Sequence, residues 1–150
     1  MSAFYIHLLP VRVLIADDAE AIRKCIRGLL ECERTIGVCG EAASFSQTLE
    51  LAATLKPDVI LLDLHMPDGH RFESAVVKSQ LLSTSQVLAI SLSQRDGETE
   101  ILANSYGASA LLDKAKLFDE LIPAIQRASC QHGQYLNATS SLPHFTNQTH

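Results

Sequence analysis

Short apolar runs that end in polar or acidic residues recur along the chain. The strongest are Val11–Ala16, Val59–Leu62 and Val87–Ile90, and two weaker runs are Ile36–Cys39 and Ala110–Leu112. Each run is continuously aliphatic rather than alternating, which is the pattern of strands covered on both faces of a parallel sheet. The pattern therefore predicts five buried β-strands.

Segments with helical periodicity separate these strands. Five helices are predicted, at 19–30, 44–55, 72–82, 97–106 and 117–128. Ser44 and Gln47 form a capping-box pattern that opens the second helix, and Pro57 should stop it. Pro123 lies inside the last helix and should either kink it or mark its first turn.

The alternation of strands and helices predicts an α/β fold with a doubly wound parallel sheet. Right-handed crossovers leave few strand orders, and we favour 2-1-3-4-5, the flavodoxin-like order. In that order the first and third strands are neighbours, and ligands bind beyond their carboxyl ends. The predicted domain covers residues 11–128, with an N-terminal extension at 1–10 and a polar, flexible tail at 129–150.

Composition narrows the classes of function. The 150 residues suit one domain, and 47% of them are hydrophobic. The formal charge of −5 and the absence of a basic stretch after Arg127 argue against direct binding to nucleic acid. No apolar run reaches membrane-spanning length and the start lacks a signal-peptide pattern, so we expect a cytoplasmic protein without membrane contact. The four cysteines lack zinc-ligand spacing and are expected to be free.

Acidic residues close two of the predicted strands. Asp17 and Asp18 follow the first strand, and Asp63 follows the third. Taken singly, the first two are ordinary helix-capping residues and the third an ordinary loop residue. Together, three carboxylates at one sheet edge repel each other unless a cation lies among them. Oxygen ligands favour Mg²⁺, so the sequence predicts a magnesium site there.

Two further residues fall at the same edge. Ser91 ends the fourth strand and offers a hydroxyl, while Lys114 follows the fifth strand and offers a positive charge. A carboxylate, a divalent cation, a hydroxyl and an ammonium group around one point are what phosphoryl transfer to a carboxylate requires. We therefore predict a site that binds or accepts a phosphoryl group.

These motifs resemble the receiver domain of two-component response regulators, in its chemotaxis-type form. The resemblance covers residues 11–127, and its matching pieces are Val13–Asp18, Asp58–Pro67, Ser91, Gly107-Ala108 and Lys114. Their order and spacing make the combination specific, although each piece alone is not.

The resemblance implies a phosphoacceptor and a metal site. Asp63 would accept a phosphoryl group from a sensor histidine kinase or a phosphotransfer protein. Asp18, Asp63 and the backbone carbonyl of His65 would hold Mg²⁺, with Asp17 assisting. Ser91 and Lys114 would bind the phosphoryl oxygens and relay their presence.

The chain also departs from the family pattern. Leu111 stands three residues before Lys114, where the family commonly has an aromatic residue that swings inward. Leu92 follows Ser91, where a small residue is common. The loop 68–71 is shorter than usual, so the third helix should begin early or be displaced. These departures leave the form of the downstream signal open.

Three functions compete at this point. The first is a phosphoacceptor signalling domain and not a multiple-turnover enzyme. Phosphorylation would change the surface formed by residues 97–106, 110–112 and 117–128. A partner protein, or a second copy forming a homodimer, would bind the changed surface. The second is a pseudo-receiver that binds proteins without phosphorylation, as Leu111 and Leu92 suggest. The third is a phosphatase, which usually needs a second acid two residues after the nucleophile, where His65 stands instead.

Overall fold

The computed structural model describes residues 9–92 and 96–130. Its five strands form one parallel sheet in the order β2-β1-β3-β4-β5, which confirms the predicted topology. The strands are β1 (Val11–Ala16), β2 (Ile36–Ala42), β3 (Val59–Asp63), β4 (Gln86–Ser91) and β5 (Ala110–Asp113).

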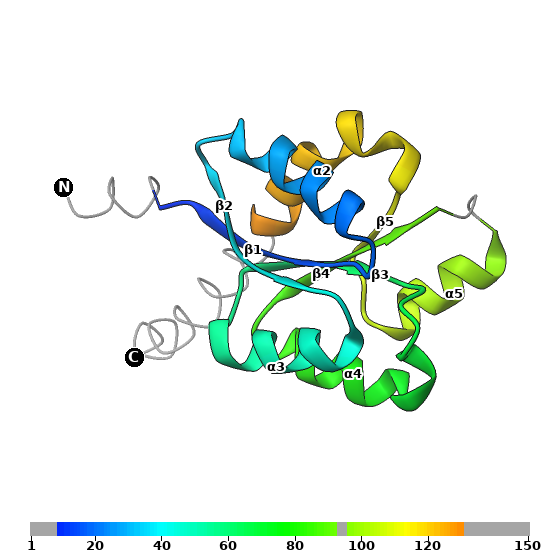
Figure 1. The fold of residues 1–150 in the computed structure, drawn as a ribbon. Coiled ribbons are helices and arrows are strands. Elements are labelled where there is room, and N and C mark those ends of the chain that lie inside the picture. Colours follow the sequence, from blue (N-terminus) through cyan, green and yellow to red (C-terminus); the bar gives the residue numbers. More distant parts are fainter. Residues whose placement is uncertain (1–8, 93–95, 131–150) are drawn as a thin grey trace, which may run out of the picture.

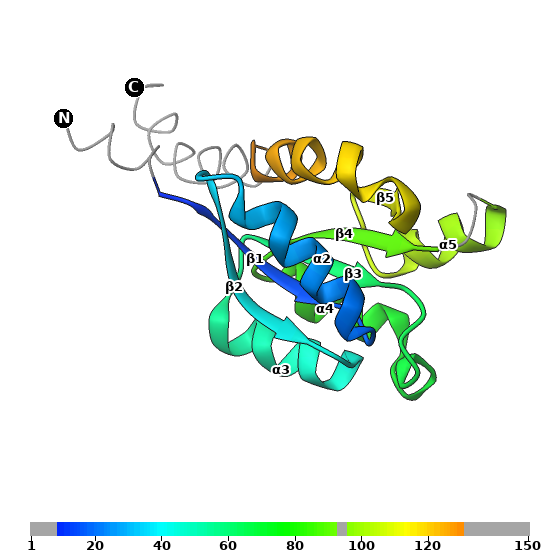
Figure 2. The ribbon, with the colours of Figure 1, turned by 45° about the horizontal axis from the view of Figure 1, so that its top comes forward.

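Helices cover both faces of the sheet (Figures 1 and 2). One face carries α2 (Glu20–Glu31) and the helix at 117–130. The other carries α3 (Phe45–Leu55), α4 (Ser74–Leu82) and α5 (Gly97–Ser105). Two 3₁₀ turns, η1 (Gly69–Arg71) and η2 (Lys114–Lys116), follow β3 and β5. None of the helices in the described ranges is long and apolar enough to cross a bilayer.

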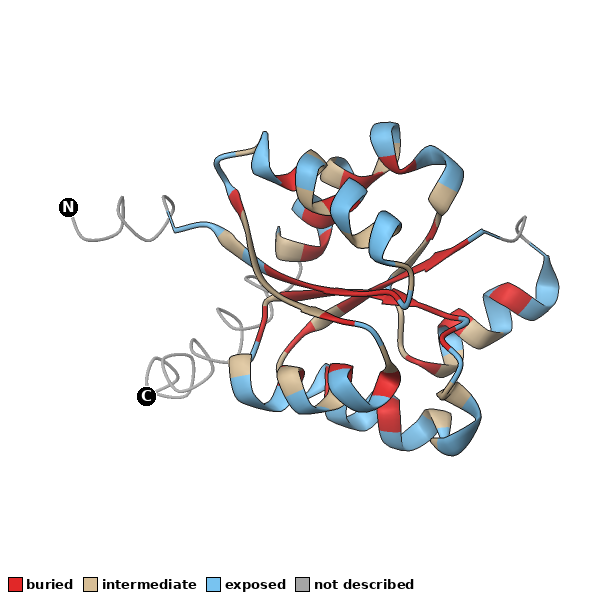
Figure 3. Ribbon diagram, viewed as in Figure 1, coloured by how far each residue is buried: buried red, intermediate tan, exposed pale blue. Residues whose placement is uncertain are grey.

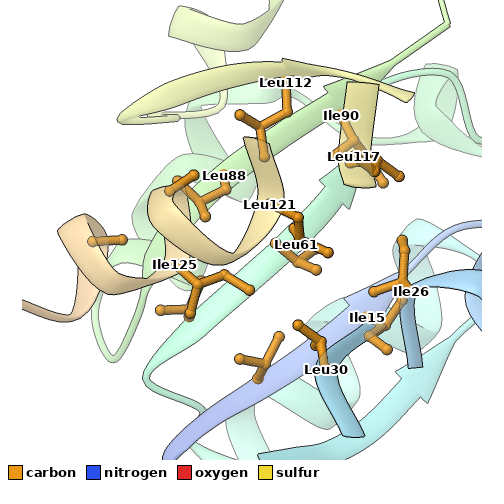
Figure 4. Close-up of a cluster of buried hydrophobic side chains, with 14 of the residues drawn as sticks. Ile15, Ile26, Leu30, Leu61, Leu88, Ile90, Leu112, Leu117, Leu121 and Ile125 are labelled. Carbon is orange, nitrogen blue, oxygen red and sulfur yellow. The ribbon is translucent and has the colours of Figure 1, made fainter. Parts of the chain in front are cut away.

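Successive strand residues feed two separate cores. Ile15, Leu61 and Ile90 point to the side of α2 and the helix at 117–130, where they meet Ile26 and Leu121 (Figure 4). The residues between them, such as Leu14 and Leu62, pack on the other side against α3 and α4. Because both faces are covered, the central strands β1, β3 and β4 are buried along nearly their whole length, whereas the edge strands β2 and β5 are mostly half-buried (Figure 3). This double burial explains the continuous apolar runs.

The start of α3 agrees with its predicted capping box. The hydroxyl of Ser44 accepts a hydrogen bond from the Gln47 N–H at 3.0 Å, while the Gln47 side chain accepts from the Ala43 N–H at 2.8 Å. Pro57 follows the helix as expected, after Lys56 takes the left-handed conformation with φ 49°. The guanidinium of Arg12 donates to the Leu55 carbonyl at 2.7 Å and so satisfies the end of the helix.

One predicted helix start was wrong, and one of two interpretations of Pro123 was wrong as well. α4 begins at Ser74, two residues later than predicted, because the shortened loop after Pro67 closes in the turn η1 before the helix starts. The last helix begins at 117, six residues before Pro123, so the proline does not mark its first turn. That helix continues to 130, two residues beyond its predicted end. Residues 1–8 and 131–150, which hold most of the predicted extension and tail, lie outside the described residues.

Gly107 turns the chain from α5 into β5. It has φ +78°, a conformation that residues with a Cβ rarely adopt. A Cβ there would lie 2.6 Å from Cδ1 of Leu82 on α4. Glycine at this position therefore allows both the turn and the close packing of α4.

Candidate functional site

The pairing of β1 with β3 sets the geometry of the acidic cluster. Ala16, the last residue of β1, lies opposite Leu62, so Asp17 and Asp63 leave the sheet at the same level. On the next strand Asp63 pairs with Ile90, which places Ser91 one residue beyond it. Ser91 in turn pairs with Asp113, immediately before Lys114. The sheet thus brings the predicted residues of four strands to one edge.

Asp63 is buried at the centre of this edge, with a side chain only 3% exposed. Its Oδ1 accepts a hydrogen bond from the His65 backbone N–H at 3.1 Å, and its Oδ2 lies 3.3 Å from Nζ of Lys114. Burial raises the pKa of Asp63 and the charge of Asp17 adds to the rise, against the opposing effects of the His65 N–H and of Lys114. Its ionised form is therefore only partly compensated.

Asp17 is fully buried beside it. Its Oδ1 accepts a hydrogen bond from the Ala19 N–H at 2.8 Å, which opens α2. Its Oδ2 lies 2.6 Å from Nζ of Lys114, a short ion pair. Apart from this ion pair, Oδ2 has no hydrogen-bond partner among the described residues. A lone pair of Asp17 Oδ2 is left for another cation.

The donor set fits a divalent cation such as Mg²⁺. One carboxylate oxygen from each of Asp17, Asp18 and Asp63 lies within 4.8 Å of the others. Two oxygens at about 2.1 Å from one Mg²⁺ lie at most about 4.2 Å apart, so small side-chain movements suffice. Lys114 supplies one positive charge against three carboxylates. The net charge of the cluster thus favours a further cation.

The remaining predicted residues lie at this edge in different settings. Ser91 is buried at the end of β4, whereas Asp18 and His65 are exposed. His65 contributes its backbone N–H to Asp63, as described above. Its side chain is exposed to solvent in the loop after β3.

Two residues of this region were not found from the sequence. Asp68, in the loop after β3, accepts hydrogen bonds from the N–H groups of Phe45 at 2.8 Å and Ser46 at 3.0 Å, so it caps α3. Arg23, on α2, donates from NH1 to the Asp17 carbonyl oxygen at 2.8 Å. The Asp68 contacts join segments that are 22 and 23 residues apart, whereas Arg23 reaches back six residues to Asp17. The only sequence signal for Arg23 was its place on the polar flank of the predicted helix.

Leu111 lies half-buried on β5, at the edge of the sheet. A pocket of about 230 Å³ separates it from α5 and is lined by Glu100, Ala103 and Asn104 among others. A second pocket of about 340 Å³ lies toward the helix at 117–130 and is lined by Asp119 and Arg127 among others. The surface predicted to carry the signal is therefore hollowed on both sides of the leucine.

Comparison with known proteins identifies the same arrangement elsewhere. Residues 13–126 match the family described as the response regulator receiver domain. The nitrate/nitrite response regulator protein NarL of Escherichia coli is 31% identical over 120 residues, which are 80% of this chain and 55% of that protein. A protein-glutamate methylesterase/protein-glutamine glutaminase of Pyrococcus abyssi is 28% identical over 128 residues, 79% of this chain and 35% of that protein. The chain thus spans about a third to a half of these relatives.

Solved structures show the same fold. The response regulator domain of Thermotoga maritima CheB superposes with a TM-score of 0.69 at 24% identity, over 80% of this chain and 96% of that domain. CheY6 of R. sphaeroides, solved in complex with the P1 domain of CheA3, superposes with a TM-score of 0.68 at 26% identity, over 81% of this chain and 98% of the other.

Proposed function

Because the chain belongs to the response regulator receiver domain family, we propose that it is a phosphoacceptor signalling domain that takes a phosphoryl group onto Asp63. One observation carries the proposal. The buried Asp63 carboxylate lies beside an ammonium group and within a cluster of three carboxylates that suits Mg²⁺. The chemistry of acyl phosphate formation needs this combination of groups at one point.

The proposed step is an in-line displacement at phosphorus. A carboxylate oxygen of Asp63 forms a bond to the phosphorus of a phosphohistidine, and the bond from phosphorus to the imidazole nitrogen breaks. When the other ring nitrogen of the phosphohistidine carries a proton, the imidazole leaves with the bonding electrons as a neutral histidine, and the second product is an aspartyl phosphate. The step needs the ionised form of Asp63, which the His65 N–H and Lys114 favour against the effect of burial. When bound, Mg²⁺ would offset the negative charge that gathers on the phosphoryl oxygens.

The residues around Asp63 have distinct proposed roles. Asp18, Asp63 and the His65 carbonyl would hold the cation, and Asp17 would assist while it keeps Lys114 in place. Lys114 would pair with a phosphoryl oxygen, and the Ser91 hydroxyl would bond another. The ammonium lies 2.6 Å from Asp17 and 3.3 Å from Asp63, so a short movement would let it follow the new charge.

The signal would pass to the surface made by α5, β5 and the helix at 117–130. A phosphoryl group adds nearly two negative charges, which would draw Ser91 and Lys114 inward and bias this surface between two states. Ile101 and Phe118, on the two helices, are 70% and 82% exposed there. A partner protein or a second copy of the chain would read the change.

The proposed phosphoryl donor is a sensor histidine kinase or a phosphotransfer protein. The complex of CheY6 with a CheA3 domain supports this choice, because CheY6 shares the fold and 26% of its aligned residues with this chain. The methylesterase activity in the names of other relatives belongs to proteins of which the chain matches about a third. We propose one covalent event per molecule rather than turnover. The pseudo-receiver hypothesis is not favoured, because the residues needed for phosphorylation share one edge of the sheet.

Labelling with acetyl phosphate, read by intact mass, tests the proposal. We expect one added phosphoryl group in the presence of Mg²⁺ and none after chelation. Asp63→Asn should abolish labelling, and Asp68→Asn, which removes a nearby structural carboxylate, should leave it intact. Equal labelling of both variants would show that another residue is the acceptor. Repeated hydrolysis of a generic phosphate ester would instead support the phosphatase.

A further inference from the structure

The backbone of Asp17 is held on both sides by groups outside the acidic cluster. Its N–H donates to the Ala42 carbonyl on β2 at 3.0 Å. Its carbonyl oxygen accepts a hydrogen bond from Arg23 NH1 on α2 at 2.8 Å. That carbonyl belongs to the planar peptide that joins Asp17 to Asp18. The guanidinium therefore fixes the peptide plane from which the exposed side chain of Asp18 projects.

Arg23 is itself fixed. Its Nε donates to Oε1 of Glu41, on the edge strand β2, at 3.1 Å, and its side chain is only 17% exposed. The other oxygen of Glu41 accepts from Nε of Arg27 at 2.7 Å. The hydrogen bond and charge of Arg27, together with those of Arg23, hold the pKa of Glu41 below its ordinary value against the opposing effect of burial. A charged network thus keeps the Arg23 guanidinium in one orientation.

We propose that Arg23 is a positioning residue for the cation site, which orients Asp18 through the Asp17–Asp18 peptide. The inference rests on the proposed function, because it assumes that the acidic cluster holds Mg²⁺. Asp18 is exposed, so the direction of its carboxylate depends on the backbone beneath it more than on packing. Arg23 donates a hydrogen bond to the peptide carbonyl of Asp17 and not to the carboxylates of the acidic cluster, so its role differs from that of Lys114.

The shape of arginine is essential to this role. One guanidinium reaches two acceptors on different elements, the Asp17 carbonyl and the Glu41 carboxylate, through separate N–H groups. A lysine would keep the positive charge but lose this planar fork. Arg23→Lys therefore separates positioning from simple electrostatic attraction.

Arg27 provides a matched control on the same helix. It shares Glu41 as a partner but does not contact Asp17. Arg27→Gln removes one positive charge and one bond to Glu41, as Arg23→Gln does, and leaves the bond to the Asp17 carbonyl intact. A difference in Mg²⁺ affinity between the two variants therefore reports the hydrogen bond from Arg23 to the Asp17 carbonyl.

Titration of the full chain with Mg²⁺ by isothermal calorimetry tests the proposal. Arg23→Gln should raise the Kd for Mg²⁺ roughly three- to tenfold, at the low end of the effects of outer-shell partners. Arg23→Lys should raise it to a similar extent, and Arg27→Gln should stay close to the parent protein. Labelling by acetyl phosphate should be slower in Arg23→Gln at limiting Mg²⁺ and should approach the parent rate at saturating Mg²⁺. A purely structural defect would slow labelling at every Mg²⁺ concentration.

Several outcomes would overturn the inference. They are a parent-like Kd in Arg23→Gln, full rescue by Arg23→Lys, or an equal rise in Arg27→Gln. If Arg23→Gln does not fold, Glu41→Gln carries the test, with a smaller rise in Kd expected and an unchanged Kd counting against it. A parent protein that binds Mg²⁺ but is never labelled would refute the phosphoacceptor and not the positioning role. A parent protein that binds no Mg²⁺ would refute both.

Discussion

Asp63 is the last residue of β3 and Asp68 lies five residues later in the loop that follows, yet their surroundings shift the pKa of the two carboxylates in opposite directions. Burial raises the pKa of Asp63, and Asp17 adds to the rise. Partial burial also opposes ionisation of Asp68, but the N–H groups of Ser46 and Phe45 outweigh it and hold its pKa below the ordinary value. The partners of the first carboxylate do not offset its burial, whereas those of the second do.

The difference follows from which elements face each side chain. Asp68 meets the start of α3, where unpaired backbone N–H groups supply hydrogen bonds to an acid. Asp63 meets the ends of neighbouring strands that carry further acids, with Lys114 as the one cation in contact with it among the described residues. A carboxylate satisfied by the protein stabilises the fold, whereas one left uncompensated is available to a ligand.

The strongest way to sharpen this contrast is Lys114→Met. The change leaves Asp17 and Asp63 buried without their ammonium partner, and breaking a buried ion pair typically costs 3–5 kcal/mol. We expect a loss of about 3 kcal/mol in the free energy of unfolding, because the acids can take up a proton instead. Urea unfolding at neutral pH in a chelator measures it, and excess Mg²⁺ should recover part of the loss.

Lys116→Met is the control for this variant. Lys116 lies two residues away in the same 3₁₀ turn and is exposed. Its loss should change stability by no more than about 0.5 kcal/mol. Similar losses in the two variants would mean that the Lys114 ion pairs do not stabilise the cluster.

Asp63→Asn should act in the opposite direction. Without Mg²⁺ it removes a poorly compensated buried charge, so we expect a gain of about 1–2 kcal/mol in the free energy of unfolding. Because the pKa of Asp63 is raised, the folded state binds more protons than the unfolded state at pH values between the ordinary pKa near 3.8 and the pKa of Asp63 in the folded protein. Stability of the parent therefore falls as pH rises through that window, and the variant should lack this fall.

The measurement is a series of urea unfolding curves across the acidic range in a chelator. A loss of stability at neutral pH in Asp63→Asn would contradict the view that this carboxylate is strained in the free protein. Added Mg²⁺ should narrow the difference, because the cation compensates the charge in the parent only.

Asp68→Asn should instead destabilise the domain, by about 1 kcal/mol, the usual cost of a lost helix cap. The amide keeps one acceptor oxygen and so loses one of the two N–H bonds. Because the pKa of Asp68 is lowered, its contribution to the stability of the domain is fully present above its ordinary pKa near 3.8. That contribution is lost as the pH falls through the pKa of Asp68 in the folded protein. Thermal unfolding checks this, with Ser44→Ala, which removes the other cap of α3, expected to cost a similar amount.

Local pattern and strand topology sufficed to predict most of the fold and the edge of the sheet at which the acidic residues gather. The runs before Asp17 and Asp63, and the order 2-1-3-4-5, place these acids on neighbouring strands, and the structure has them there. Parallel strands put their carboxyl ends at one edge regardless of loop details. The cluster could therefore be predicted without knowing a single long-range side-chain contact.

The features that were missed depend on such contacts. Asp68 reaches α3 across 23 residues, and Arg23 reaches Glu41 across 18. The register shift between β1 and β2, at Val13/Leu14, also has no signature in the apolar pattern. Each of these features depends on how distant segments pack together in the folded domain, and the periodicity of apolar residues does not predict that packing.

Asp18→Asn gives the smallest expected effect on the free protein. Asp18 is exposed, so without Mg²⁺ the change should alter the free energy of unfolding by no more than about 0.5 kcal/mol. With Mg²⁺ at about 100 times its Kd, the parent should gain about 2.7 kcal/mol through linkage, and the variant should gain much less. Thermal unfolding with and without Mg²⁺ measures both terms, and Asp119→Asn, an exposed acid away from the cluster, is the control. An equal stabilisation by Mg²⁺ in Asp18→Asn and the parent would mean that the cation binds elsewhere. The uncompensated charge of Asp63 would then have no cation to bind, and the contrast with Asp68 would lose its functional meaning.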